Sequence, residues 1–449
     1  AAPGNSIGTL NVAGNVTFDA GSTYEVETNA AGQADRITAT GTATLQGGTV
    51  NVLAGSGNYA PNTSYTILSA AAGRSGQFQN VTSNLAFLDP TLGYDTNTVV
   101  LTLTRNDIGF GEIGGTFNQR AAGGGVDSLG RGNVIWDQTV QFDAASARAA
   151  FDQLSGEIHA STQTTLLEDS RFVRDATLDR LYSADANAGW VRVFGSWGST
   201  DSDGNAAELD RDSSGVVVGA DAQLDNDARL GLMASYSRSN SDARNSSSQS
   251  RNLYIGAYAG GVWDSLALRA GAAYGWHDLE SSRAVSFTGF TDNLRSNDGK
   301  ATSGQVFGEI GYQLNSIEPF ANLAFVSLDM DGFTEQGGAA ALSVQSGSTD
   351  TSFSTLGVHL QNEFTTGRFK GTLGWRHAFG DITPLSTLSF QSGNAFTVAG
   401  IPIAENAAVL DLGLDFSAGE NARFGFSYNG QFGSGVSDNS VRAEFEVKF

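Results

Sequence analysis

The chain of 449 residues contains no cysteine, and this absence excludes disulfide bonds and metal sites built on thiolates. Such a composition is compatible with a bacterial protein that must stay unfolded during export. The chain also has no run of about 18 apolar residues, which excludes a transmembrane helix. A transmembrane β-barrel remains open, because its strands are short and only every second residue has to be apolar.

Positive charge is also scarce in this chain. Lys and Arg number 25 and Asp and Glu number 47, so the net charge is −22 at pH 7 and the pI is near 4.4. No basic stripe is available to neutralise phosphate groups, and we therefore expect no nucleic-acid partner. The first residues show no positively charged segment followed by an apolar one, so we expect any signal peptide to have been removed or to lie upstream.

The C-terminal stretch shows the pattern that organises the rest of the chain. Apolar side chains occupy the odd positions from Val441 to Phe449, and charged side chains occupy the even positions from Arg442 to Lys448. This period of two predicts a β-strand with one apolar and one charged face. Similar segments recur from residue 189 onward and predict twelve strands in 189–449, and an even number is typical of single-chain bacterial barrels.

The connections between these predicted strands alternate in length. Short turns are expected at 225–227, 263–265, 315–318, 365–367 and 418–421, and long polar loops at 200–213, 239–249, 278–300, 331–350, 380–404 and 433–438. This alternation is typical of an outer-membrane barrel and argues against the alternative of a soluble β-sandwich. An aromatic girdle is expected from Trp190, Tyr236, Trp263, Trp276, Tyr312, Trp375 and Tyr428.

One helix is predicted at 161–184, and we assign 161–188 as a pore-spanning segment. A helix that is polar nearly all round either bridges solvent or lies in a wet, charged environment, so a solvated linker helix is one interpretation. As a plug, a helix of about 20–25 residues would span about 30–37 Å, which matches the membrane. The residues expected to form the plug are Glu168, Asp169, Arg171, Phe172, Arg174, Asp175, Asp179 and Arg180. The residues expected to line the lumen are Arg192, Arg269, Glu309, Glu363, Lys370, Arg376, Asp411, Arg423, Arg442 and Glu444.

The N-terminal part has a different texture. Residues 1–105 predict many short strands with tight turns, where glycine adopts φ > 0 without strain. Strands this short suit either a stacked β-solenoid or a small sandwich, and no strict repeat period decides between them. Residues 106–160 are expected to be a Gly-rich linker with short helices, because the three successive glycines at 123–125 disfavour a stable helix.

Catalytic and metal-binding patterns are not found. Gly4–Gly8 matches the G-x-S-x-G pattern of a nucleophile elbow but lacks the strand before it and the helix after it, so a glycine-bounded turn is the preferred interpretation. Asp411 and Asp415 share a lumen face, where we expect them to pair with arginines. No metal-ligand spacing is found among the four histidines, His159, His277, His359 and His377. We therefore predict no catalytic residue, no metal site, no cofactor and no enzymatic activity for this chain.

Two stretches near the predicted plug resemble those of type Va autotransporters, a family of bacterial secretion proteins. The sequence LSGEIHAS at 154–161, followed by EDSRFVRDA at 168–176 and Arg180-Leu181, is similar to the linker helix of that family. The barrel that ends in residues 441–449 is similar to its translocator domain. Residues 1–105, with GNSIGTL at their start, and with DRIT and YTIL further on, resemble the C-terminal stem of a β-helical passenger, which often serves as an autochaperone.

The resemblance implies a mainly all-β protein, in which a β-solenoid-like passenger stem precedes a 12-stranded antiparallel transmembrane β-barrel with a plug helix in its lumen. It implies a translocator that inserts into the outer membrane of a Gram-negative bacterium and secretes or displays its N-terminal passenger, with residues 1–105 at the cell surface. The barrel-assembly machinery would read Phe445, Val447 and Phe449 of the C-terminal strand. Other expected partners are outer-membrane lipid, lipopolysaccharide and periplasmic chaperones, and we expect a monomer.

The sequence departs from the family in two respects, because relatives are usually more helical where this chain has the glycines at 123–125 and because an Asn-Asn pair is missing. It also leaves two other functions open. Members that cleave themselves inside the barrel commonly carry an Asn-Asn pair in the plug helix. This chain has no Asn-Asn pair, and only Asn187 lies near the end of the helix, so this type of cleavage is not predicted. The alternatives are a passive porin-like channel and a surface adhesin or enzyme whose activity lies within residues 1–105.

Overall fold

The computed structural model describes residues 1–4, 6–55, 63–183, 187–224 and 228–448. It consists of two compact units, which are described separately. The first contains Ala1–Ser155 together with Val285–Asp292 and Phe390–Phe396, and the second contains the remaining segments. None of the described helices is long and apolar enough to cross a membrane.

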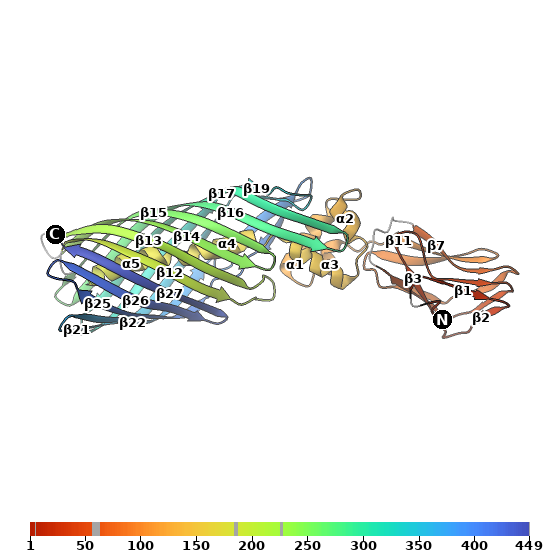
Figure 1. Cartoon of the computed structure of the whole chain (residues 1–449), viewed down its shortest axis with the longest axis horizontal. Helices are drawn as coiled ribbons and strands as arrows, with labels where there is room; N and C mark the ends of the chain where they lie inside the picture. Colours follow the sequence, from red (N-terminus) through yellow and green to blue (C-terminus); the bar gives the residue numbers. More distant parts are fainter. Residues whose placement is uncertain (5, 56–62, 184–186, 225–227, 449) are drawn as a thin grey trace. The chain divides into compact units, whose positions relative to one another are not determined.

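The N-terminal part of the first unit is a stack of short parallel strands (Figure 1). The sheet orders β1-β4-β7, β2-β5-β8 and β3-β6-β9 show that each coil of the chain contributes one strand to each of three sheets. An antiparallel sandwich would not produce this pairing. The strands are β1 (Thr9–Val12), β2 (Val16–Phe18), β3 (Thr23–Thr28), β4 (Arg36–Ala39), β5 (Ala43–Gln46), β6 (Thr49–Ala54), β7 (Thr63–Ala70), β8 (Arg74–Gln77) and β9 (Asn80–Ser83).

Alternating side chains fill the inside of this stack. Tyr24, Val26, Val50 and Ile67 are fully buried, and the Tyr24 hydroxyl donates a hydrogen bond to the Ile67 carbonyl at 2.6 Å. The parallel arrangement ends at an antiparallel hairpin, in which β11 (Thr98–Arg105) pairs with both β7 and β10 (Leu88–Tyr94). The hairpin therefore covers the sheet that β7 would otherwise leave open on this side.

Residues 106–155 are more helical than the sequence predicts. The helices are the 3₁₀-helix η1 (Phe110–Ile113), α1 (Phe117–Asp127), α2 (Val134–Thr139) and α3 (Ala144–Leu154). The helix α1 runs through all three glycines that we expected to disfavour it. A Cβ on Gly123 would lie 3.0 Å from the backbone of Gly111, and one on Gly125 would lie 2.5 Å from the Phe396 ring. These glycines are therefore required for close packing, which outweighs their low helix propensity.

The second unit is a closed antiparallel barrel, and the prediction of twelve strands is confirmed for the part of the chain that the structure covers (Figure 1). The barrel strands are β12 (Ala188–Thr200), β13 (Leu209–Gln223), β14 (Ala228–Ala243), β15 (Ser246–Trp263), β16 (Leu266–Phe287), β17 (Phe290–Tyr312), β18 (Ile317–Met330), β21 (Gly347–Phe364), β22 (Gly367–Gly380), β25 (Asn406–Ser417), β26 (Ala422–Gly433) and β27 (Val436–Lys448). The first and last strands close it, with Ala188 opposite Lys448 and Thr200 opposite Val436.

Each barrel strand presents apolar side chains outward and polar side chains inward. Leu232 and Phe426 are 68% and 59% exposed on the outer face, whereas Arg192 and Arg269 are 4% exposed inside. This distribution is the reverse of a soluble protein and is the one expected for a barrel surrounded by lipid. The prediction that Trp190 belongs to the aromatic girdle is wrong. Trp190 has the same inward parity as Arg192 and is buried in the lumen.

Several predicted loops are in fact strand. The loop expected at 278–300 is occupied by β16 and β17, and the loop expected at 433–438 contains the start of β27. Backbone pairing does not depend on an apolar outer face, so the strands continue into stretches where both faces are polar. Short strands of the true loops form a separate sheet from β19 (Phe333–Thr334), β20 (Leu342–Val344), β23 (Leu385–Phe390) and β24 (Phe396–Ala399). The turn predicted at 225–227 lies outside the described residues.

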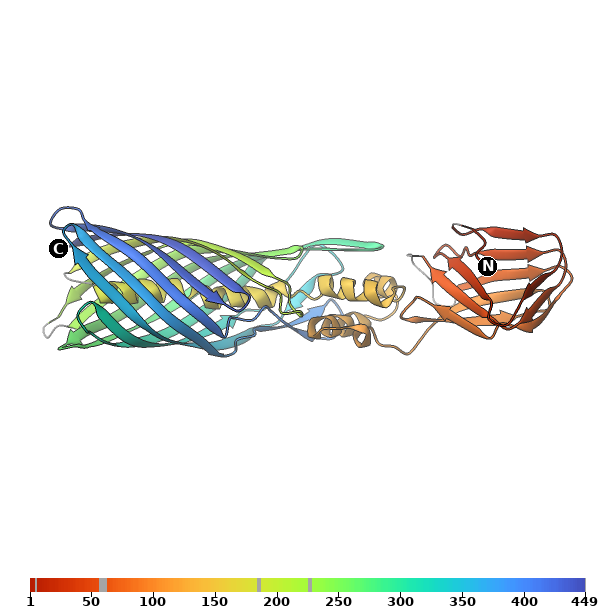
Figure 2. The ribbon, with the colours of Figure 1, turned by 90° about the horizontal axis from the view of Figure 1, so that it is seen from below.

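Two helices, not one, run inside the barrel (Figure 2). They are α4 (Ile158–Asp169) and α5 (Arg171–Ser183), and Ser170 separates them. The Ser170 hydroxyl donates to the Leu167 carbonyl at 2.7 Å, a local bond that competes with helix continuation. The predicted end of the helix at residue 184 lies outside the described residues.

We expect Gly231→Ala to destabilise the barrel. Gly231 lies opposite Tyr258, and a Cβ would come 2.3 Å from its ring. Overpacking of this kind typically costs about 1–3 kcal/mol. The matched control is Gly195→Ala, where nothing lies within 4 Å of an added Cβ. Thermal unfolding in detergent, followed by the heat-dependent gel migration of the barrel, measures both variants, and equal stability would contradict this packing.

Candidate functional site: the plugged lumen

The first plug helix, α4, contacts serine side chains of the barrel wall. Thr165 and Ser241 share a hydrogen bond of 2.7 Å. Asp169 is buried and accepts hydrogen bonds from Ser213 at 2.6 Å and from Ser239 at 2.5 Å. A carboxylate bonded by two hydroxyls is compensated for its loss of water, so α4 can lie directly against β13 and β14.

Ion pairs hold the middle of the plug on two sides. Glu168 accepts two hydrogen bonds from Arg376, at 2.7 and 2.9 Å. Arg171 donates to both oxygens of Asp438, at 2.6 and 3.2 Å, and Arg211 reaches the same carboxylate at 3.2 Å. All five side chains are nearly fully buried. Bidentate pairs of this kind fix orientation as well as distance, so they specify how the helix is rotated in the lumen.

The next turn of the plug pairs with the last strand of the barrel. Arg442 lies 3.2 Å from Asp175 and 3.4 Å from Asp179. Arg192 donates to Asp179 at 2.8 Å and to Glu444 at 3.0 Å. The strands β12 and β27 close the barrel at this point, so the plug contacts both sides of the closing seam.

A second cluster surrounds the last turn of α5. Arg180 donates to both oxygens of Asp221, at 2.7 and 2.9 Å, and lies 2.8 Å from Glu446. The Tyr258 hydroxyl donates to Asp221 at 2.9 Å and accepts from the Trp190 indole at 2.7 Å. The opposite charges of this network are paired, which is the condition under which buried charges are tolerated.

Aromatic and amide contacts complete the plug surface. Phe172 stacks on Phe194 with ring centroids 4.4 Å apart. Arg174 donates to the Gln305 amide oxygen at 3.0 Å and lies over the Phe353 ring at 5.6 Å. Thus each side chain that the sequence assigns to the plug contacts the barrel wall.

The remaining lumen-lining candidates fall into two groups. Asp411 lies 3.1 Å from Arg442, Lys370 lies 3.0 Å from Asp415, and Arg423 lies 3.8 Å from Glu446. These three are therefore part of the ionic lining. Glu363 has the parity of an inward residue, but it is exposed at the end of β21, where the strand leaves the lumen.

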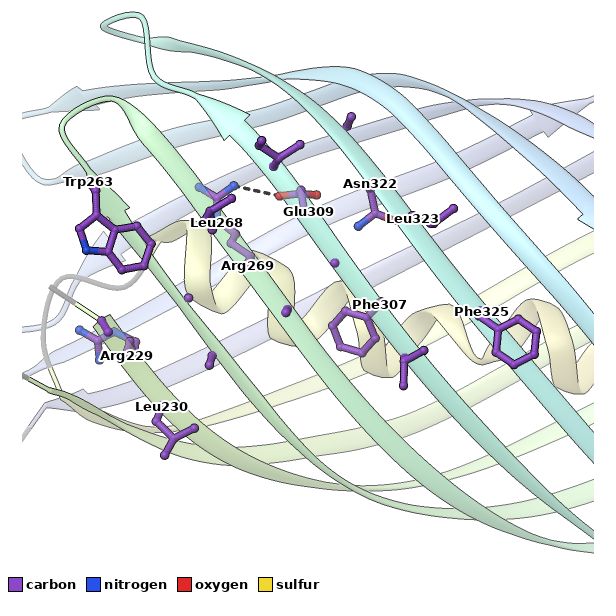
Figure 3. Close-up of a pocket in the computed structure, with 18 of the residues that line it drawn as sticks. Arg229, Leu230, Trp263, Leu268, Arg269, Phe307, Glu309, Asn322, Leu323 and Phe325 are labelled. Atoms are coloured by element: carbon purple, nitrogen blue, oxygen red, sulfur yellow. Dashed lines mark hydrogen bonds and ion pairs between the residues drawn. The ribbon is translucent and has the colours of Figure 1, made fainter. Parts of the chain in front are cut away.

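Arg269 and Glu309 come from the neighbouring strands β16 and β17 and lie 2.9 Å apart (Figure 3). The same stretch of wall has an apolar pocket of about 1000 Å³, to which Leu268, Leu323 and Phe325 contribute. These three side chains are exposed, as a surface in contact with lipid requires. Residues that alternate along a strand therefore face opposite sides of the wall, the polar ones toward the lumen and the apolar ones toward the outside.

Sequence reasoning missed several residues of this lining. Asp438 and Arg211 were expected in long loops and Glu318 in a short turn, yet all three are buried in the lumen. The missed signal is parity, because Asp438 has the same even numbering as Arg442 and Glu444 on its strand. Phe445 and Val447, the predicted assembly signal, lie exposed on the outer face of β27, and Phe449 lies outside the described residues.

Small cavities lie beside the plug. Two cavities next to α5 have volumes of about 30 and 80 Å³. A water molecule occupies about 30 Å³ in the liquid, so these cavities hold a few waters or a small ion. The arrangement fills the lumen with paired charges.

A further charged cluster ties the start of α4 to the loop between β18 and β21. Glu335 lies 2.8 Å from His159 and accepts two hydrogen bonds from Arg283, both at 2.7 Å. Burial by itself would raise the pKa of the Glu335 carboxyl, but the Arg283 guanidinium and His159 together hold it below its usual range. The Leu342 amide also donates to Glu335, at 3.0 Å, and so joins the loop to the cluster.

Solved structures and curated proteins are similar to this chain. The translocator domain of autotransporter NalP from Neisseria meningitidis aligns with a TM-score of 0.56 and 17% identity, over 66% of this chain and 100% of that one. At this identity the likeness is one of fold. Two proteins of Serratia marcescens, both named extracellular serine protease, are 33% and 30% identical over 100% and 99% of this chain.

The two Serratia proteins overturn the prediction that the chain has no enzymatic activity, because both are named as proteases. That prediction considered only the residues present here. The chain spans about half the length of the curated relatives that it matches, 50% and 49% respectively.

We expect Arg180→Ala to cost far more than the loss of a surface ion pair. Among the described residues, the change leaves Asp221 with Arg229, and Glu446 with Arg423 at 3.8 Å. Breaking a buried pair from one side typically costs about 3–5 kcal/mol, and the remaining arginines place the expected loss toward the lower end of that range. The control is Arg251→Ala, whose pair with Glu280 is exposed and should contribute about 0–1 kcal/mol. Chemical unfolding in detergent measures both. An equal loss of stability in the two variants would show that the plug does not depend on this cluster.

We expect acid to weaken the loop contact made by Glu335. Its folded pKa lies below the unfolded value of about 4.5, so its stabilisation is fully present above that pH and is lost as pH falls further. Pepsin cleavage within 331–346 should therefore increase steeply between about pH 5 and pH 2. Glu335→Gln should be cleaved faster at the upper pH and show little further change. An identical acid dependence in that variant would refute the assignment.

The barrel itself identifies the family. Residues 189–429 match the model of the autotransporter beta-domain, which is more than half of the chain. The match begins with the first barrel strand and ends within β26. The chain belongs to the autotransporter family, and it is an outer-membrane translocator that secretes or displays an N-terminal passenger.

Proposed function

We propose that the chain exports its own N-terminal region through the lumen and that residues 1–105 stand at the cell surface. The observation that carries this proposal is the direction of the plug. Ser183 lies at the short-turn end, where its carbonyl accepts from Arg368, and His159 lies at the other end, beside the long loop that contains Glu335. The polypeptide before α4 therefore leaves the lumen at the long-loop end, and long loops of such barrels face outward.

Folding of residues 1–105 outside the membrane would then prevent back-sliding. The stack buries apolar side chains that the unfolded chain exposes, and unfolding it would be required for return through the pore. The paired charges of α4 and α5 would hold the end of the exported chain in the lumen after export.

We further propose that the exported cargo is a serine protease region of a longer polypeptide. Support comes from the two Serratia proteins, which are named for this activity and are about twice as long as the part that matches. Labelling of the full-length product with a fluorophosphonate probe tests this. Absence of labelling in secreted and cell-surface material would refute it.

Other partners follow from the translocator role and are proposed with it. The outward aromatic and aliphatic residues Phe445, Val447 and Phe449 would be read by the barrel-assembly machinery, and periplasmic chaperones would hold the unfolded chain beforehand. The outer face would contact lipid and lipopolysaccharide, and the closed barrel would act as a monomer.

Cysteine labelling of intact cells tests the surface location directly, because the chain has no cysteine of its own. Thr17→Cys in the stack should react with a membrane-impermeant maleimide on intact cells. Ser316→Cys, in the short turn between β17 and β18, should react only after the outer membrane is permeabilised. Both positions are exposed, so reactivity reports location. Labelling of Thr17→Cys only after permeabilisation would place the stack in the periplasm and end the proposal.

A further inference from the structure

Two carboxylates and one imidazole lie close together at the short-turn end of the lumen. Glu309 on β17, Glu318 on β18 and His359 on β21 come from adjacent strands, and Glu318 lies directly opposite His359 in the strand register. One ligand atom from each lies within 4.8 Å of the others. All three side chains are buried. The sequence conceals this group, because its members are far apart along the chain.

The His359 ring is held in place but one of its nitrogens is not satisfied. Nδ1 lies 2.8 Å from the Thr372 hydroxyl, and the ring stacks on Phe320 with centroids 4.0 Å apart. Nε2 is buried, points toward Glu309 and has no hydrogen-bond partner within the described segments. A buried polar atom without a partner is costly, so this atom requires an explanation.

The distance from Nε2 to Glu309 is informative. Nε2 lies 3.4 Å from Glu309 Oε1, which is longer than the 2.7–3.2 Å of an ordinary N–H···O hydrogen bond. Two ligands bound at about 2.0–2.1 Å in tetrahedral geometry lie about 3.3–3.4 Å apart. The observed separation is therefore the one that a shared Zn²⁺-sized ion would produce.

Arg269 donates hydrogen bonds to both carboxylates and leaves part of their acceptor capacity unused. It donates to Glu309 at 2.9 Å and to Glu318 at 2.5 and 3.1 Å. Each carboxylate oxygen has a second lone pair, so acceptor capacity remains. Two carboxylates and one guanidinium carry a net charge of −1 next to the His359 ring, and this charge favours a cation. Hydrogen bonds from a neighbouring side chain to ligating carboxylates are a regular feature of metal sites.

Space for the ion and a water molecule is present. The cavity of about 80 Å³ between α5 and the wall is lined by Glu309, His359 and Thr372. Gly311 leaves room for the Glu318 carboxylate, because a Cβ at residue 311 would lie 2.2 Å from Glu318 Oε1. Water can therefore supply a fourth ligand.

We propose that Glu309, Glu318 and His359 bind one divalent transition-metal ion of the Zn²⁺ class. One imidazole and two carboxylates suit such an ion, whereas Mg²⁺ and Ca²⁺ prefer oxygen ligands alone. The ion ties three strands together at the short-turn end. It also holds the plug, because the Tyr182 ring of α5 packs on His359 at 4.7 Å and under Arg269 at 5.1 Å.

Cobalt is the probe for this site, because tetrahedral Co²⁺ gives visible absorption bands. The whole chain, folded in detergent and stripped with a chelator, should bind one Co²⁺ that Zn²⁺ displaces. His359→Ala and Glu318→Gln should each weaken binding by at least about 10-fold, the loss that even a neighbouring substitution causes. His377→Ala is the matched control, since the half-buried His377 has the outward parity of β22 and its substitution should leave binding unchanged.

Folding is monitored in each variant by heat-dependent gel migration, so a loss of binding is counted only in a folded barrel. Zn²⁺ should also raise the unfolding temperature of the unchanged chain and of His377→Ala, but not of His359→Ala. The proposal is overturned if the unchanged chain shows no tetrahedral Co²⁺ bands. It is equally overturned if folded His359→Ala and Glu318→Gln bind Co²⁺ as tightly as the unchanged chain, which would indicate adventitious binding elsewhere.

Discussion

The pairing of charges between the plug and the barrel wall is the constraint on which the rest of this structure depends. The outer face of the barrel is apolar and faces lipid, so the interior must satisfy its polar groups without an apolar core. Glu168, Arg171 and Arg180 are nearly fully buried, and each is held by a bidentate partner on the wall. Removing charge from water is costly unless geometry is good, so these pairs determine both the depth and the rotation of the helices.

The same pairing links the fold to translocation. The described helices run through the lumen from the long-loop end at α4 to the short-turn end at α5, and β12 is the next described element. The lumen holds α4 and α5, and two cavities beside α5 have volumes of about 30 and 80 Å³. A passive channel of the porin type requires an open, hydrated path, and the filled lumen argues against it.

Polar clusters at the two ends of the lumen differ in kind. At the long-loop end, Arg283 balances the charge of Glu335, and His159 and the loop backbone complete its hydrogen bonds. At the short-turn end, Arg269 donates to both carboxylates, and His359 Nε2 has no hydrogen-bond partner among the described residues. The first cluster is a closed structural contact. The second has unused ligand capacity, and for this reason it carries the inference of a metal ion.

Alternation by itself determined the barrel, its strand number and the lipid-facing side chains, because a period of two assigns each residue to a face without knowledge of its neighbours. It also placed Arg192, Arg376 and Arg442 in the lumen. Only the tertiary structure decided where strands end, since pairing continues through polar stretches such as 278–300, and which charges meet, since Asp438 and Arg171 are far apart in sequence. It also decided that α1 is a helix and that Glu309, Glu318 and His359 form one group, because close packing and strand register are properties of three-dimensional contact.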